Sequence, residues 1–334
     1  MRTHAIGARW ALRCLLFWQH AAMRTRTNTR GSRVPLTVLL SLWASVPGAA
    51  EPATTTTTTT TTTTVPALPA HASESRWPTL EAAYASDRHD EGLREAKAQL
   101  ALHPDDVELL ALYARFLYEE GERHKRDGAV DKRALYEEMV RTLSRARALS
   151  PTDARVGWGL GIAKARLGTT RGVLSSLSMA REIERLWLEA ARSDVRYVSL
   201  NGEEKLPCDA YLTLGIFYRL IPDWWIVEVV AGTRGDIDKA LTWLRRANQC
   251  APEAVRTHKE LGVGLLCAAE RRDDPALVKE AQQAFAKGLA ITPRFHTERV
   301  DHQDMRRLLT TTKGACGYSR DGQQTLDESA MPTR

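Results

Sequence analysis

The chain has 334 residues and a formal net charge of +6, and this length accommodates one or two domains. Residues 1–50 hold seven arginines and no acidic residue, so the rest of the chain has 40 of the 47 basic residues against 41 acidic ones, a net charge of −1. Because no basic block interleaved with aromatic residues occurs there, the composition excludes a general nucleic-acid binder, and we predict no nucleic-acid partner.

The first 50 residues have the three parts of a secretory signal. Arginines at positions 24, 26, 30 and 33 precede the apolar run 34–46, and Gly48-Ala49-Ala50 follows it. We expect translation to start at Met23, cleavage near Ala50, and a periplasmic or secreted location. The run of thirteen residues is too short for a helix that crosses a bilayer of ~30 Å, so no stable membrane span is expected in the mature chain. An uncleaved anchor is the alternative.

Two segments are predicted to be disordered. Residues 51–76 contain eleven consecutive threonines with Pro and Ala around them, and such a segment buries too little apolar surface to offset the entropy of ordering. An O-glycosylated tether and a neutral repeat expansion are both open. Residues 314–334, rich in Gly, Ser, Asp and Gln, are predicted to form a disordered tail.

Residues 77–313 are rich in Ala, Leu, Arg and Glu, which favours helices. Four prolines each follow a helical run, and each is predicted to end the second helix of a helix pair: Pro104, Pro151, Pro252 and Pro293. Their spacings of 47, 101 and 41 residues are irregular. We predict an all-α fold, a right-handed α-solenoid of four to five irregular antiparallel helix pairs, without β-strands.

Residues 208–252 show the repeat most clearly, with Tyr211, Leu214-Gly215, Tyr218, Ala240, Leu244, Ala247 and Pro252 at the expected spacing. This pattern resembles the tetratricopeptide repeat (TPR). The long third unit and the insertion Pro222-Asp223-Trp224-Trp225 are similar to the regulator of microtubule dynamics family and its bacterial relatives. A looser similarity is to the periplasmic TPR T-component of tripartite transporters. These resemblances imply an interaction protein without catalysis, and an exported protein would not meet microtubules.

The TPR resemblance places the first helix of each pair on the inner face of the array. The candidate groove residues are Arg115, Tyr118, Trp158, Arg166, Arg219, Arg256 and Lys259. This face is mixed apolar and basic, so we expect it to bind an extended peptide or an acidic segment, with Arg219, Arg256 and Lys259 pairing with carboxylates. The alternative is that these cations are ordinary solvated side chains.

The adjacent tryptophans Trp224 and Trp225 would be a costly exposed surface in a free loop. One interpretation is a lid or a self-association surface, since tryptophan is common at binding hot spots. The other is that the insertion folds back and covers its own repeat.

Four cysteines follow the leader. Cys208 opens the first helix of the fourth unit and Cys250 nearly ends the second, so the two residues lie together in an antiparallel pair. A disulfide and two buried thiols are both open. No CxxC occurs, and the spacing of His296 and His302 does not put both on one helix face, so we predict no metal site and no cofactor.

No HExxH, no GxSxG and no Cys-His nucleophile pair is present, so the chain is predicted not to be an enzyme. We expect an exported adaptor that binds a protein or peptide in its concave groove. The alternative is an accessory subunit that holds a small ligand for a transporter, which a deep apolar cavity lined by Trp158 would favour. An unrecognised enzyme is a third interpretation.

Overall fold

The computed structural model describes residues 75–123, 131–171, 173–199 and 201–320. By its contacts the chain divides into two units, Met1–Thr64 and Val65–Arg334, and every described residue belongs to the second. The predicted leader, most of the linker, and residues 124–130 and 321–334 lie outside the described residues.

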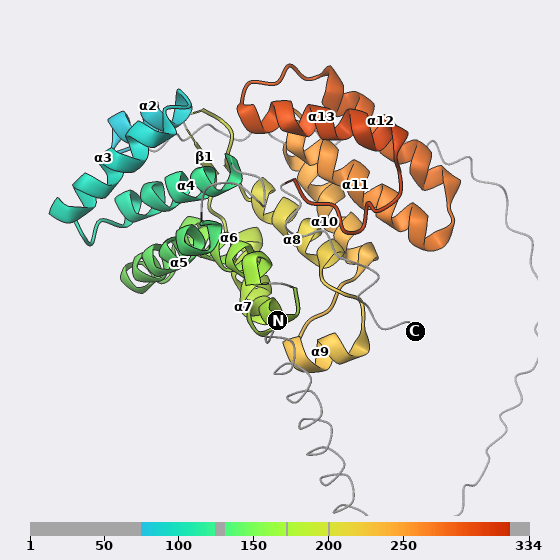
Figure 1. Cartoon of the computed structure of the whole chain (residues 1–334), viewed down its shortest axis with the longest axis horizontal. Coiled ribbons are helices and arrows are strands. Elements are labelled where there is room, and N and C mark those ends of the chain that lie inside the picture. Colours follow the sequence, from blue (N-terminus) through green and yellow to red (C-terminus); the bar gives the residue numbers. More distant parts are fainter. Residues whose placement is uncertain (1–74, 124–130, 172, 200, 321–334) are drawn as a thin grey trace, which may run out of the picture. The chain divides into compact units, whose positions relative to one another are not determined.

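The described part is an array of helices (Figure 1). Their bounds are α2 Pro78–Ala85, α3 His89–Leu102, α4 Val107–Arg123, α5 Lys132–Leu149, α6 Ala154–Arg171, α7 Val173–Arg192, α8 Cys208–Leu220, α9 Trp225–Ala231, α10 Ile237–Cys250, α11 Val255–Arg272, α12 Pro275–Ala290 and α13 His296–Thr310. Five pairs pack together in chain order within these residues, namely α2–α3, α4–α5, α6–α7, α8–α10 and α11–α12, and α13 packs against α11 and α12. The predicted all-α solenoid is confirmed.

The prolines end the second helices where the sequence predicts. Helices α3, α5, α10 and α12 end at Leu102, Leu149, Cys250 and Ala290, two or three residues before Pro104, Pro151, Pro252 and Pro293 respectively. Three of the helices begin at an aspartate whose carboxylate accepts backbone N–H groups of the first turn, at Asp131, Asp236 and Asp274. Local signals therefore define most helix ends.

Glycines allow the paired helices to approach closely. A Cβ at Gly215 would lie 2.5 Å from Cγ of Leu244, and one at Gly262 would lie 2.2 Å from Cε1 of Phe285. Two apolar cores follow along the array. One includes Phe116 and Tyr136, and the other includes Leu214, Leu244 and Phe285.

Three segments depart from a plain array of pairs. Tyr197–Val198 (β1) and Lys205–Leu206 (β2) form a short antiparallel hairpin, so the prediction of no strands is wrong. Helix α9 lies in the predicted insertion of the fourth pair. Residues 314–320, which we name the C-terminal strap, include the buried Ala315 and Tyr318, so the tail prediction is wrong for this segment.

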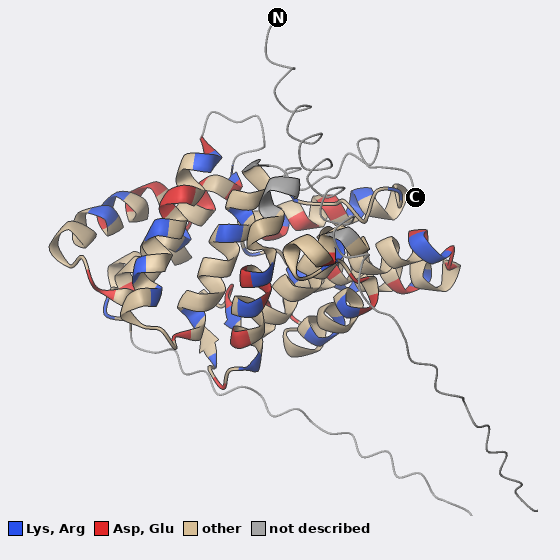
Figure 2. Cartoon of the chain, turned by 90° about the horizontal axis from the view of Figure 1, so that it is seen from below, with Lys and Arg blue, Asp and Glu red and all other residues tan. Residues whose placement is uncertain are grey.

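In the part of the chain that the structure describes, no helix is long and apolar enough to cross a membrane. Figure 2 shows Lys and Arg interspersed with Asp and Glu along the helices. The absence of a nucleic-acid partner stays a prediction.

Candidate functional site

The first helices α4, α6, α8 and α11 contribute to the walls of one cavity of about 140 Å³. Its remaining walls come from α2, α5, the hairpin, the start of α13 and Arg320 of the strap. The apolar lining includes Leu112, Met139, Leu143, Trp158, Ile162 and Leu212. Since one water needs about 10–15 Å³ of such volume, the cavity has room for roughly ten water-sized groups.

A smaller cavity of about 80 Å³ adjoins the first. Both are lined by Tyr118, Ile162, Arg256 and Arg320, which therefore lie between them. The seven groove residues expected from the sequence all line one or both cavities: Arg115 and Trp158 the larger, Arg166, Arg219 and Lys259 the smaller, and Tyr118 and Arg256 both. The structure thus brings them together around two adjoining cavities.

The hairpin is fastened across the larger cavity by Arg115. This α4 guanidinium forms ion pairs with Glu81 of α2 and Glu204 of the hairpin, each at 3.1 Å, and its Cζ lies 3.9 Å from the Tyr84 ring centroid. On the other side, the Thr297 hydroxyl donates to Glu203 at 3.0 Å. The hairpin therefore connects the start of the array to α13.

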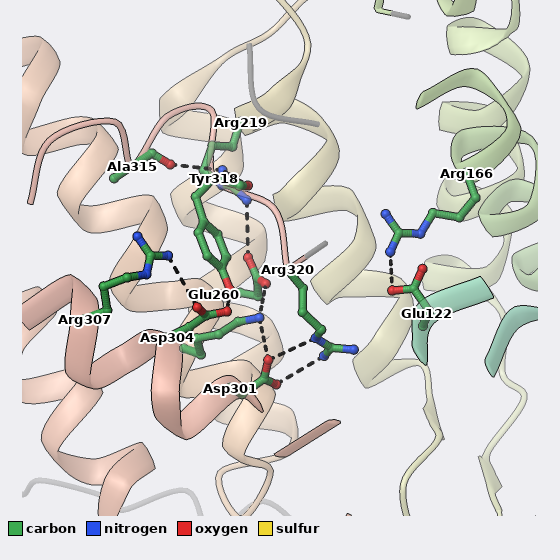
Figure 3. A network of polar contacts seen from close by, with 11 residues as sticks. Glu122, Arg166, Arg219, Glu260, Asp301, Asp304, Arg307, Ala315, Tyr318 and Arg320 are labelled. Atoms are coloured by element: carbon green, nitrogen blue, oxygen red, sulfur yellow. Dashed lines mark hydrogen bonds and ion pairs between the residues drawn. The ribbon is translucent and has the colours of Figure 1, made fainter. Parts of the chain in front are cut away.

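The C-terminal strap is fastened by Arg219 (Figure 3). The Arg219 guanidinium donates to the carbonyl oxygens of Ala315, Cys316 and Tyr318 at 3.0–3.1 Å, and pairs with Glu260 at 3.3 Å. A disulfide joins Cys316 to Cys267 of α11. Arg219 is therefore occupied by the chain's own carbonyls.

Lys259 is fully buried, and its ammonium also pairs with groups of the protein itself. Its ammonium lies 2.8 Å from carboxylate oxygens of both Glu260 and Asp301, and Asp301 accepts in addition from Arg320 at 3.1 Å. Burial opposes the charged form of Asp301, but Arg320 and Lys259 together lower the pKa of its carboxyl to about 2. The expectation that Arg219 and Lys259 pair with a ligand's carboxylates is wrong, and they are not solvated either.

Arg256 differs from its neighbours on α11. It has no hydrogen bond and no ion pair within the described residues, and its Nε is buried. Two further buried donors on the wall of the larger cavity have no acceptor in the described part of the chain, namely Nε1 of Trp158 and Nη2 of Arg115. Because a buried donor without an acceptor costs about 1–3 kcal/mol, this cavity has three positions where a ligand's oxygen would be stabilised.

Carboxylates without a cation line the same cavity. Glu119, Glu203 and Asp209 have no ion pair among the described residues. Burial, then the charges of Glu203 and Glu122, raise the pKa of Glu119 to about 8, although it accepts a hydrogen bond from Tyr84 at 3.2 Å. Burial likewise raises the pKa of Asp209 to about 6, against the N–H group of Lys205 and the charge of Arg256. These three carboxyl groups thus lack an ion-pair partner among the described residues, and a proton holds Glu119 neutral at pH 7.

Arg166 pairs with Glu122, and the two lie together in Figure 3.

The two tryptophans of the insertion differ in exposure to solvent. Trp224 is partly buried and packs against the core, whereas Trp225 is 70% exposed, next to Val229 and Val230 at 69% and 68%. Neither tryptophan lines the two cavities, so they form no lid over them. Self-association through Trp225 stays a prediction.

Cys208 and Cys250 form a disulfide with Cα atoms 5.4 Å apart, which joins the start of α8 to the end of α10. The second disulfide, Cys267–Cys316, is not expected from the sequence.

Among the described residues, no group of three or more His, Cys, Asp or Glu side chains could hold a metal ion. Three further lining residues could not be predicted from the sequence, namely Glu203, Glu204 and Arg320, because they lie on the hairpin and the strap, where no helical period marks an inner face.

No family model matches the chain, and no curated protein matches it significantly. Several solved structures are similar. One titled crystal structure of MamA has 18% identity and a TM-score of 0.34, over 63% of this chain and 92% of that one. TTC0263, a thermophilic TPR protein in Thermus thermophilus, has 19% identity and a TM-score of 0.43, over 69% and 97%.

A human IFIT1 dimer with PPP-AAAA has 16% identity and a TM-score of 0.41, over 68% of this chain and 43% of that one. Because these similarities are weak, the assignment of an α-solenoid rests on the helix pairs of the chain itself. The narrower resemblances to the regulator of microtubule dynamics family and to the transporter T-component stay predictions.

Proposed function

We propose that this protein binds a small molecule in the larger cavity and catalyses no reaction. One observation carries the proposal: the inner face of the array forms a cavity of about 140 Å³, bordered by the hairpin and by Arg320 of the strap, with buried donors on its walls that have no acceptor among the described residues. Enclosed, mostly apolar pockets with a few polar groups are typical of small-ligand sites.

The same geometry argues against an extended peptide along the whole inner face. The hairpin and the strap occupy part of that face, held there by Arg115 and Arg219. The remaining space for roughly ten water-sized groups is too small for several peptide residues. The cavity lined by Trp158 favours a protein that holds a small ligand, as an accessory subunit of a transporter would.

We also propose that binding takes place outside the cytoplasm. The secretory signal expected in residues 1–50 and the two disulfides support an oxidising compartment such as the periplasm.

The test is a variant that fills the cavity. Gly159 lines it, and a Cβ there would lie 3.5 Å from Leu143, an ordinary contact, so Gly159→Met places a long side chain inside the cavity without forcing the helices apart. The control is Ala101→Met, which adds the same side chain at an exposed position of α3. We expect native mass spectrometry and thermal shift against a metabolite mixture to detect a ligand for the full chain and for Ala101→Met, but not for Gly159→Met. Undiminished binding by Gly159→Met, or no bound molecule with the unaltered chain, would contradict the proposal.

A protein-binding adaptor is the second candidate function. It is favoured by the apolar side chains of Trp225, Val229 and Val230, which α9 exposes together. Sedimentation of the full chain with Trp225→Ser and Val229→Ser changed together, compared with the unaltered chain, would detect a loss of self-association. Equal sedimentation of the two proteins over a wide concentration range would count against self-association through this surface.

A further inference from the structure

Among the described residues, donors without an acceptor and carboxylates without an ion pair line the larger cavity together. On one side are hydrogen-bond donors, the guanidinium of Arg256 with its buried Nε and the indole Nε1 of Trp158. On the other side are the carboxylates of Glu119, Glu203 and Asp209, which form no ion pair within the described residues.

Only some of the charged side chains on these walls lack an ion pair within the described residues. Elsewhere on the same walls, Arg115 pairs with Glu81 and Glu204, Arg294 with Glu298, and Arg320 with Asp301. Leaving a charge unpaired in a partly dry site is unfavourable, and proteins either pair such charges or neutralise them. The chain pairs its other charges, so the unpaired set marks where a bound molecule would supply the missing counter-charges.

We infer that the ligand is a small zwitterion of the amino-acid class: a carboxylate that accepts from Arg256 and Trp158, an ammonium that donates to Glu119, Glu203 or Asp209, and an apolar body. This inference rests on the proposed function and specifies the chemistry of the same cavity. The apolar body would contact Leu112, Leu143 and Ile162. The cavity volume fits a molecule of roughly ten non-hydrogen atoms, since each occupies about the space of a water.

A ligand with one charge fits less well. An anion would pair with Arg256 but would add negative charge beside three unpaired carboxylates. A cation would pair with the carboxylates but would leave the Arg256 and Trp158 donors without acceptors, at about 1–3 kcal/mol for each. The raised pKa of Glu119, about 8, means that a proton neutralises part of the excess negative charge at pH 7. The remaining set of one cation and about two carboxylates suits a ligand that carries both signs.

The test compares four leucine derivatives of nearly equal shape by calorimetry with the full chain. L-leucine carries both charges, L-leucinamide only the positive one, 4-methylpentanoate only the negative one, and 4-methylpentanamide neither. We expect L-leucine to bind at least tenfold more tightly than each of the others, because each lost charge-assisted hydrogen bond is worth about a factor of ten or more.

Two variants assign the charges to their residues. Arg256→Met should weaken L-leucine at least tenfold and leave L-leucinamide unchanged. Glu203→Gln should weaken L-leucine and L-leucinamide and leave 4-methylpentanoate unchanged. Arg145→Met, which removes an exposed guanidinium paired with Asp105 far along α5, is the matched control and should change none of the four. Thermal unfolding of each variant checks that the fold is kept.

The outcomes separate this inference from the proposed function. Two outcomes would show that the assignment of a zwitterionic ligand is wrong while the small-molecule function stands. In one, a singly charged or neutral derivative binds as tightly as L-leucine. In the other, none of the four binds while the metabolite mixture yields another ligand. If no small molecule binds in either experiment, both are wrong. Loss of L-leucinamide binding in Arg256→Met would also overturn the assignment of Arg256 to the carboxylate.

Discussion

Substitution of Glu119 by glutamine should change how the stability of this protein depends on pH. Glu119 is buried on α4, accepts a hydrogen bond from Tyr84 at 3.2 Å, and has no cation as a partner within the described residues. Burial and the neighbouring charges of Glu203 and Glu122 raise its pKa to about 8. Glutamine imitates the protonated carboxyl in shape and can still accept from the Tyr84 hydroxyl.

The sign and size of the effect follow from the two pKa values. An unfolded glutamate titrates near pH ~4.3, so between that pH and 8 the folded protein holds a proton that the unfolded chain releases. The stabilisation is therefore fully present below about pH 4.3 and is lost as the pH rises through 8. At about 1.4 kcal/mol for each unit of pKa, the loss from about pH 5 to about pH 9 is on the order of 4 kcal/mol. Asp209 and Glu204, with pKa values raised by burial to about 6 and about 7, add losses of the same sign at lower pH.

Urea unfolding of the full chain and of Glu119→Gln from pH 5 to pH 9 measures this pH-dependent loss of stability. We expect the variant to gain stability over the unaltered chain as the pH rises, most steeply between about pH 5 and about pH 7. Glu95→Gln, at an exposed position of α3, is the control and should give a nearly constant difference. A difference for Glu119→Gln that is equally constant, within about 0.5 kcal/mol, would refute the buried, unpaired carboxylate on which this reasoning depends.

Two further perturbations test the contacts that close the cavities. Lys259→Met removes one of the two buried cations that pair with each of Glu260 and Asp301 and should cost roughly 3–5 kcal/mol in urea unfolding, whereas Lys239→Met, at an exposed pair with Asp236, should cost less than about 1 kcal/mol; similar costs would contradict the buried network. Cys316→Ser opens a disulfide between residues 49 apart and should lower stability by about 2–4 kcal/mol and speed tryptic cleavage after Lys313 and Arg320, as followed by mass spectrometry; unchanged cleavage would show that the polar contacts of the C-terminal strap hold it without the disulfide.

The inner face could be predicted from the sequence because its signals are local. The prolines that follow α3, α5, α10 and α12 define the pairs, and the 3.6-residue period within each first helix defines which side chains face inward. Arg115, Trp158 and Arg256 come from three different helices, yet each is assigned to the inner face from its own repeat alone, and each lines the larger cavity.

The partners of these side chains could not be predicted. Lys259 pairs with Asp301, 42 residues away, and Arg219 donates to Ala315, 96 residues away. No period relates such positions, and both acceptors belong to segments packed on the array from outside the repeats. The hairpin is a similar case, since two-residue strands give no alternating pattern. The sequence therefore places cations on the inner face but does not distinguish occupied from unoccupied ones.

That distinction depends on two residues one turn apart on α11. Lys259 and Arg256 are separated by three positions, so both side chains face the region between the cavities. Asp301 is near enough to influence both, but Lys259 and Arg320 occupy its two oxygens. Arg320 belongs to the C-terminal strap, and its positive charge acts against the charged form of Arg256. Glu260, whose charge also favours the charged form of Arg256, pairs with Lys259 and Arg219. Arg256 thus has carboxylates nearby but forms an ion pair with none of them among the described residues, so its guanidinium is available to donate to a ligand's carboxylate.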